Sequence, residues 1–202
     1  RVLFRSDAII KHTDRVLSRW EAGKPEEMMF EMMRTTMGII ADIIFSLDDI
    51  EKDAADLNWA LTTVFEVLTK RTVAFQPPPA WLPLYDNRRM NRAKKTVEDF
   101  IMPIIKDRRA NGSPNQDVLA DLVDAVDEET GERLTDAEIC NELKTLFGAG
   151  HETTALMLMW TLYLLTQYPD VEEKLFEEAS RVLGNRHPIK EDLRSEEHTS
   201  EL

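Results

Sequence analysis

The sequence predicts an all-α protein. Apolar residues recur every three or four positions through most of the chain, the spacing that gathers them on one face of a helix. No stretch alternates apolar and polar residues for long enough to form a strand, and no segment is repeated. Because 43% of the residues are hydrophobic, the chain can bury a core, and we expect a globular fold.

Three helices are predicted in the N-terminal third. The first covers residues 9–20 and is expected to stop at Gly23, since glycine and the proline that follows it shortly afterwards break helices. The second is expected over residues 27–45, where a stripe of methionines is interpreted as core packing because flexible thioethers fill irregular gaps. The third is expected over residues 53–70. Five of its side chains are predicted to face inward: Leu57, Leu61, Val64, Phe65 and Leu68.

Residues 75–86, Phe-Gln-Pro-Pro-Pro-Ala-Trp-Leu-Pro-Leu-Tyr-Asp, interrupt the helical pattern. Consecutive prolines exclude a helix and favour a stiff, extended connection. Phe75 and Trp81 would be costly to expose to water, so we expect this loop to pack against a pocket. A long helix over residues 87–109 and a short one over residues 117–126 are predicted to follow.

The longest predicted helix has a well-marked start. Thr135 can cap it, and Glu138 three residues later completes a capping box. The next strong stop is the Tyr168-Pro169 pair, which gives a helix of roughly 32 residues and about 48 Å. Residues 156–165 are apolar nearly all round, so we expect this part to be buried on every side.

Two glycines, Gly148 and Gly150, interrupt this helix, although each costs about 1 kcal/mol relative to alanine. Without side chains they would let a flat, bulky group approach the backbone. Thr153 and Thr154 can turn their hydroxyls onto the carbonyls of Ala149 and Gly150, four residues back, which bends a helix locally. We therefore expect a groove in the helix, with an acid, Glu152, and an alcohol at its edge.

Residues 149–154, Ala-Gly-His-Glu-Thr-Thr, resemble the distal-helix signature of the cytochrome P-450 family of haem-thiolate monooxygenases, Ala/Gly-Gly-x-Asp/Glu-Thr-Thr/Ser. The long capped helix around them agrees with the family, and residues 168–184 resemble its next helix. The resemblance covers residues 7–193. It implies a fragment of the mainly helical P-450 fold, about helices D to J in the family's lettering.

The resemblance also implies a function. A cytochrome P-450 uses haem b and dioxygen to insert one oxygen atom into a small apolar organic substrate. Its electrons come from NAD(P)H through a redox partner, a ferredoxin or a flavoprotein reductase. Five side chains are candidates for the lining of the substrate pocket, although plain core is the commoner role for each: Phe65, Leu68, Phe75, Trp81 and Leu146.

Four residues of the motif acquire roles from the resemblance. Ala149 and Gly150 would pack over the distal face of the haem, and Thr153 would hydrogen-bond the dioxygen held there or a water beside it. Glu152 would relay protons inward from solvent. Splitting the O–O bond needs two protons at a site without bulk water, so an acid next to an alcohol makes a suitable relay. His151, at the variable position, is expected to face a neighbouring helix instead of the haem.

The family's iron ligand, a cysteine in a Phe-x-x-Gly-x-x-x-Cys loop near the C-terminus, has no counterpart in this sequence. Cys140 precedes the distal helix and is not that ligand. The segment alone is therefore expected to be inactive. A single cysteine also excludes an internal disulfide and suits a reducing compartment, so a cytoplasmic location is expected.

The two ends are expected to be foreign to the gene. If residues 194–199 are encoded AGA TCG GAA GAG CAC ACG, the reverse complement translates as Arg-Val-Leu-Phe-Arg-Ser, which is residues 1–6. Such an inverted pair resembles a sequencing adapter joined to both ends of a DNA fragment. We expect residues 7–193 to be a partial P-450 domain from a longer protein, and residues 1–6 and 194–202 to be adapter-derived.

Composition and motif also bear on other functions. The net charge of −13 argues against nucleic acid or an anionic membrane surface as the main partner, and the apolar stretch 155–165 is too short to span a bilayer. A zinc protease is one alternative, since His151-Glu152 opens the motif His-Glu-x-x-His, but Ala155 occupies the second ligand position. The other is a non-catalytic helical bundle for protein interaction, in which the glycines only permit tight packing.

Overall fold

The computed structural model describes residues 6–113, 115–184, 186–189 and 192. These residues form seven helices and contain no strand, only an isolated antiparallel bridge between Val126 and Arg133. The predicted all-α class is confirmed. The expected adapter-derived ends lie outside the described residues, apart from Ser6.

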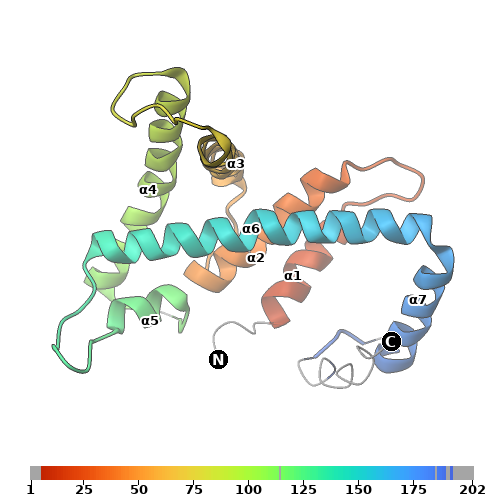
Figure 1. The fold of residues 1–202 in the computed structure, drawn as a ribbon. Coiled ribbons are helices and arrows are strands. Elements are labelled where there is room, and N and C mark those ends of the chain that lie inside the picture. Colours follow the sequence, from red (N-terminus) through yellow and green to blue (C-terminus); the bar gives the residue numbers. More distant parts are fainter. Residues whose placement is uncertain (1–5, 114, 185, 190–191, 193–202) are drawn as a thin grey trace.

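The helix α6, Asp136–Gln167, is the axis of the molecule and runs across its whole width (Figure 1). The predicted capping box starts it: the Glu138 amide donates to Thr135 Oγ1 over 3.3 Å, and the Thr135 amide donates to Glu138 Oε2 over 2.8 Å. The helix ends before Pro169, as predicted. Its 32 residues equal the predicted length.

Of the two N-terminal helices, α2 (Met28–Phe45) crosses and packs on α6, and α1 (Ser6–Leu17) packs on α2 (Figure 1). Helix α2 agrees with its predicted range within one residue, whereas α1 ends three residues before the predicted Trp20. Residues 18–20 follow as a turn, because the amides of Arg19 and Trp20 bond to carbonyls three residues back.

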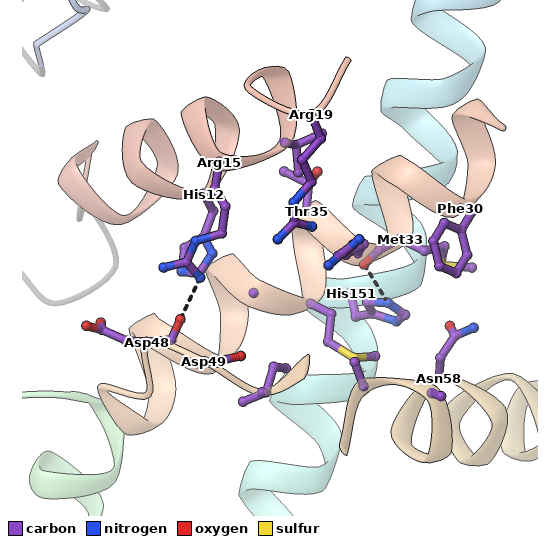
Figure 2. A pocket seen from close by; sticks show the side chains of 17 residues that line it. His12, Arg15, Arg19, Phe30, Met33, Thr35, Asp48, Asp49, Asn58 and His151 are labelled. Carbon is purple, nitrogen blue, oxygen red and sulfur yellow. Dashed lines mark hydrogen bonds between the residues drawn. The ribbon is translucent and has the colours of Figure 1, made fainter. Parts of the chain in front are cut away.

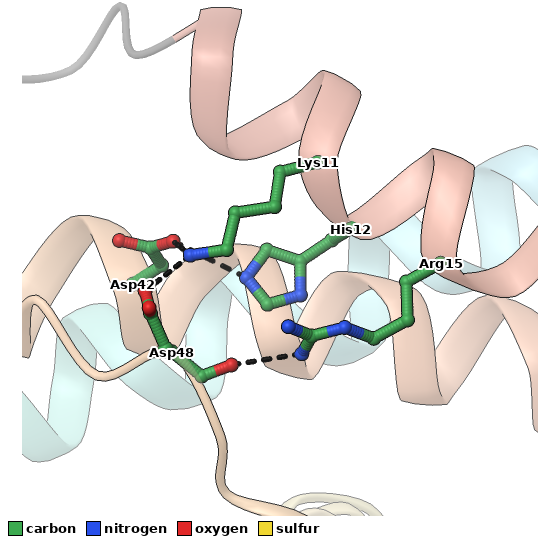
Figure 3. A network of polar contacts seen from close by, with 5 residues as sticks. All are labelled: Lys11, His12, Arg15, Asp42 and Asp48. Atoms are coloured by element: carbon green, nitrogen blue, oxygen red, sulfur yellow. Dashed lines mark hydrogen bonds and ion pairs between the residues drawn. The ribbon is translucent and has the colours of Figure 1, made fainter.

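A polar network holds α1 against α2 and the loop that follows it (Figure 3). Lys11 Nζ donates to Asp42 Oδ2 over 3.0 Å, and the buried His12 ring places Nε2 3.3 Å from the same oxygen. Lys11 also pairs with Asp48, and Arg15 donates to the carbonyl oxygen of Asp48 over 2.8 Å. Asp42 is therefore a buried carboxylate with two partners on α1, which fixes how the two helices pack.

The next two helices, α3 (Glu51–Val73) and α4 (Tyr85–Asn111), form an arm that projects from the N-terminal half of α6 (Figure 1). Both helices are longer than predicted. The loop between them does not pack as expected, because Phe75 is 99% exposed and Trp81 80% exposed. That prediction is wrong: Asn87 of α4 holds the loop backbone by donating to the carbonyls of Pro79 and Leu82, but within the described residues the two aromatic side chains stay uncovered.

Helix α5 (Val118–Asp124) is short and begins at the N-cap Asp117, while α7 (Pro169–Leu183) follows α6 directly. Asp117 Oδ1 accepts from the Ala120 amide over 2.8 Å, and Oδ2 accepts from Arg108 over 3.0 Å. Arg108 also donates to the Phe45 carbonyl over 2.7 Å. This buried ion pair thus joins the end of α4, the start of α5 and the end of α2.

The core lies where α2, α4 and the first half of α6 meet. Phe45, Phe100 and Phe147 pack together there, with ring centroids 5.8 to 6.3 Å apart. The second half of α6 was expected to be buried on every side, and within this chain it is not: Trp160 is 54% exposed. The described residues offer that half little to pack against, and α7 turns away from it at the far end (Figure 1).

Candidate functional site

The motif at residues 149–154 lies inside α6, and its helix is continuous. Thr153 Oγ1 donates to the carbonyl oxygen of Ala149 over 2.5 Å, as the sequence predicted. Both residues are exposed, and their spacing of four positions places them on the same face of the helix. The prediction of the same bond from Thr154 to Gly150 is wrong: the Thr154 hydroxyl makes no such bond within the described part of the chain.

Apolar side chains border this face. Leu146, one turn before, is 42% exposed, and Met157, one turn after, is 62% exposed. With the small side chain of Ala149 between them, α6 presents an open apolar strip that contains the hydroxyl of Thr153. A flat apolar group with a polar reacting centre could lie on such a strip, and the haem contacts expected of Ala149 and Thr153 stay a prediction.

The two glycines face neighbouring helices instead of this strip. A Cβ at Gly148 would lie 3.6 Å from Leu61 of α3, and one at Gly150 would lie 2.9 Å from Ile40 of α2. At Gly150 the end of the Ile40 side chain would have to shift to make room for a Cβ, whereas the distance at Gly148 is an ordinary van der Waals contact. The haem contact expected for Gly150 would have to come from its backbone, and that contact stays a prediction.

Glu152 is half-buried between the open strip and α3. Its Oε2 is buried and has no hydrogen-bond partner among the described residues. Burial raises the pKa of Glu152, and the nearby negative charge of Glu66 on α3 raises it further. A carboxyl in this state holds its proton closer to neutral pH than an exposed glutamate does, as a proton donor requires.

His151 is fully buried on the α2 side of α6, with Nε2 3.1 Å from the carbonyl oxygen of Met33. The prediction that it faces a neighbouring helix is confirmed. Burial lowers the pKa of His151 to about 4, so the ring is neutral at physiological pH. Because a carbonyl only accepts, Nε2 carries the proton, and Nδ1 is left as a buried acceptor with no partner among the described residues.

The other sequence candidates lie apart from the motif or beside it. Leu146 borders the open strip and Phe65 lies near Gly148, whereas Leu68 is 45% exposed and does not face inward as predicted. Cys140 is buried, and burial raises the pKa of its thiol, which suits a packed side chain. Within the described residues, no three His, Cys, Asp or Glu side chains gather as a metal site would need, and no helix is long and apolar enough to cross a membrane.

Sequence reasoning did not find a cavity that is lined by four of the helices. It has a volume of about 320 Å³ and lies between α1, α2, the start of α3 and His151 of α6 (Figure 2). Its lining comes from segments as far apart in sequence as His12 and His151. None of the five predicted pocket residues contributes to it. No local pattern signals such a convergence, because it depends on how four helices pack.

Comparison with known proteins agrees with this fold and motif. The family model for cytochrome P450 matches residues 6–196. A cyclooctat-9-en-7-ol 5-monooxygenase from Streptomyces melanosporofaciens is 32% identical over 95% of this chain and 42% of its own length. A bifunctional cytochrome P450/NADPH–P450 reductase from Bacillus subtilis is 40% identical over 46% of this chain and 9% of its own length.

Solved structures agree as well. The haem domain of cytochrome P450DA, in a mutant form, superposes with a TM-score of 0.73 at 26% identity, over 94% of this chain and 41% of that one. The chain thus spans about two fifths of the length of the first relatives it matches. A family match over nearly all of the chain, together with the helical arrangement and the motif in α6, shows that the chain belongs to the cytochrome P450 family.

Proposed function

We propose that this chain is part of a haem-dependent monooxygenase that inserts one oxygen atom of dioxygen into a small apolar organic substrate. The observation that carries the proposal is the open apolar strip of α6, where Thr153 lies next in sequence to the half-buried Glu152, whose Oε2 has no hydrogen-bond partner among the described residues. The name of the Streptomyces relative, which describes a monooxygenase, supports the same reaction class.

Electrons are proposed to come from NAD(P)H through a ferredoxin or a flavoprotein reductase. The Bacillus relative supports a reductase, because its name joins a cytochrome P450 to an NADPH–P450 reductase. Nucleic acid is not among the proposed partners, because the net charge of −13 would repel it. The proposed location of the protein is the cytoplasm.

Haem b, when bound, supplies the iron at which dioxygen is reduced. Ala149 and the backbone of Gly150 are proposed to contact the ring, since the strip that carries Ala149 is apolar and uncovered. The thiolate ligand is proposed to come from a cysteine of the whole protein outside this chain, because Cys140 is buried away from the strip and its raised pKa favours the thiol.

The chain's own contribution is proton delivery. Glu152 takes protons from the side of α3, where Glu66 is exposed, and passes them along α6 to the Thr153 hydroxyl. The single hydrogen of that hydroxyl points to the Ala149 carbonyl, so in the relay it leaves this carbonyl and is donated towards the haem side while the hydroxyl oxygen accepts a proton from Glu152. A relay of this kind delivers protons where bulk water is excluded.

Labelled dioxygen tests the proposed reaction. The complete protein, loaded with haem and supplied with NADPH and a reductase, should convert apolar substrates to products that carry one atom from ¹⁸O₂, read by mass spectrometry. Its reduced carbonyl complex should show a thiolate-type spectrum. Products labelled only from water, or no thiolate-type spectrum, would contradict the assignment.

Glu152→Gln should slow turnover of the complete enzyme by about 10²-fold or more, because an amide does not relay protons. The solvent isotope effect on turnover should rise, since proton delivery then limits the rate. Glu142→Gln, an exposed site on the same helix, serves as the matched control. An unchanged solvent isotope effect in Glu152→Gln would remove Glu152 from the relay.

The pH profile of turnover tests the direction in which neighbouring charges shift the pKa of Glu152. Because the charge of Glu66 raises the pKa of Glu152, Glu66→Gln should lower that pKa and move the alkaline decline of turnover to lower pH. Arg89 pairs with Glu66 over 3.1 Å, so Arg89→Gln should leave that charge uncompensated and move the decline to higher pH. Shifts in the same direction for both variants would show that Glu66 acts in another way.

One observation favours the alternative of a non-catalytic helical bundle. Gly150 does permit tight packing of Ile40 of α2 on α6, which is what that alternative expects of it. Packing alone, however, gives no reason for a buried carboxylate oxygen without a partner, Oε2 of Glu152. The monooxygenase proposal accounts for both features.

A further inference from the structure

The cavity of about 320 Å³ lies on the opposite side of α6 from the open strip. His151 lines it, and Thr153, two residues later, lies about 200° further around the helix. The volume falls in the range of about 300–1,000 Å³ that is typical of small-molecule sites. A ligand there would be separated from the haem face by the thickness of α6.

Two buried hydrogen-bond acceptors of the lining lack partners. They are Nδ1 of His151 and Oδ1 of Asn58, and neither is paired with any described residue. Figure 2 shows both side chains at the same end of the cavity, near Phe30. His151 Nδ1 must accept, because Nε2 already donates to the Met33 carbonyl and the ring is neutral. Leaving two such acceptors unpaired is costly, so a partner with hydrogen-bond donors is expected.

The rest of the lining selects a neutral molecule with an apolar body. Met33, Met37, Ile50 and Ala54 form apolar walls. Arginines and aspartates also line the cavity, and Arg15 is already bonded to the backbone of Asp48. Since side chains of both signs are present, the cavity has no single charge that would favour an anion or a cation.

We propose that this cavity is a second ligand site, which takes a small apolar molecule that carries two hydroxyl groups. The hydroxyls donate to His151 Nδ1 and Asn58 Oδ1, and the hydrocarbon body packs against the methionines and Ile50. The site is independent of the proposed oxygenation chemistry, because it lies on the other side of α6 from Thr153.

Calorimetry with a matched pair of probes tests the proposal on the complete haem-loaded protein. Cyclooctane-1,5-diol has two donors, and cyclooctane-1,5-dione has the same skeleton with none. The haem absorption band changes when a ligand binds at the haem face. Binding that releases heat but leaves this band unchanged is therefore assigned to the second site, which we call the silent site. We expect the diol to occupy this silent site about tenfold or more tightly than the dione.

Variants then locate the silent site. Asn58→Leu should weaken the silent binding of the diol about tenfold, because it removes one acceptor. Thr62→Val, which removes a polar group from α3 outside the lining, should leave it unchanged. The proposal is overturned if no silent binding occurs, if diol and dione bind equally, or if Asn58→Leu has no effect. None of these readouts depends on product formation, so they are distinct from the tests of the monooxygenase reaction.

Discussion

In the complete enzyme, Thr153→Ala is expected to divert electrons from product into hydrogen peroxide while haem and substrate affinities stay near those of the unmodified protein. Assistance by a positioned proton donor is worth about 10²- to 10⁴-fold, so product formed per NAD(P)H consumed should fall sharply. The hydroxyl acts only after dioxygen binds. Its loss therefore changes the fate of the electrons without changing how the substrate is held.

The structure gives a reason to expect that this variant folds. Thr153 is exposed within the chain, and its hydrogen bond goes to the carbonyl of Ala149, which the helix can satisfy without it. Alanine also has the higher helix propensity. No buried polar group is left unpaired by the change, so the effect on activity can be measured on a folded protein.

A matched control is available on the same helix. Thr161 Oγ1 donates to the carbonyl of Met157 over 2.8 Å, the same backbone contact two turns further along. Thr161→Ala should therefore keep the coupling of NAD(P)H to product. If Thr153→Ala also keeps it, Thr153 only bends the helix, and its place in the relay is wrong.

The parts of the fold that local chemistry dictates could be predicted from the sequence. The start of α6 follows from Thr135 and Glu138, whose side chains cap the helix within one turn. Its end follows from Pro169, which cannot continue a helix. The burial of His151 against a neighbouring helix could also be predicted, because its place in the motif separates it from the exposed Thr153.

Burial that depends on distant elements could not be predicted in the same way. Trp160 and Phe75 are apolar and were expected to be covered, yet the described chain places nothing over them. Apolar character tells which side chains gain from burial, but not which element of a fold supplies the cover. The 320 Å³ cavity was missed for the same reason, since Asn58 and His151 meet only when α3 packs near α6.

The motif at residues 149–154 contains one feature that local sequence determines and one that depends on a distant helix. The hydrogen bond from Thr153 to Ala149 is local, and its geometry follows from a spacing of four residues. The direction of Gly150 is not local: its missing Cβ faces Ile40 of α2, which is 110 positions away in the sequence. Glycine in a helix indicates that something approaches the backbone, but only the packing shows that a neighbouring helix does so here.

The largest effect on stability is expected for Asp117→Ala, which should lower the free energy of unfolding by about 3–5 kcal/mol, because it leaves Arg108 buried with no opposite charge. The side chain of Asp117 is 0% exposed and that of Arg108 7% exposed, so water does not replace the lost partner. The same change removes the N-cap of α5, which adds about 1 kcal/mol.

Asp117→Asn separates these two contributions. Its amide oxygen can still accept from the Ala120 amide, so the cap is kept while the charge is lost, and an intermediate destabilisation is expected. Asp99→Ala breaks the exposed pair with Lys95 and should cost less than about 1 kcal/mol. Urea denaturation followed by circular dichroism would rank the three variants. If Asp117→Ala unfolds at the same urea concentration as Asp99→Ala, Arg108 finds other partners, and the junction of α2, α4 and α5 does not depend on this pair.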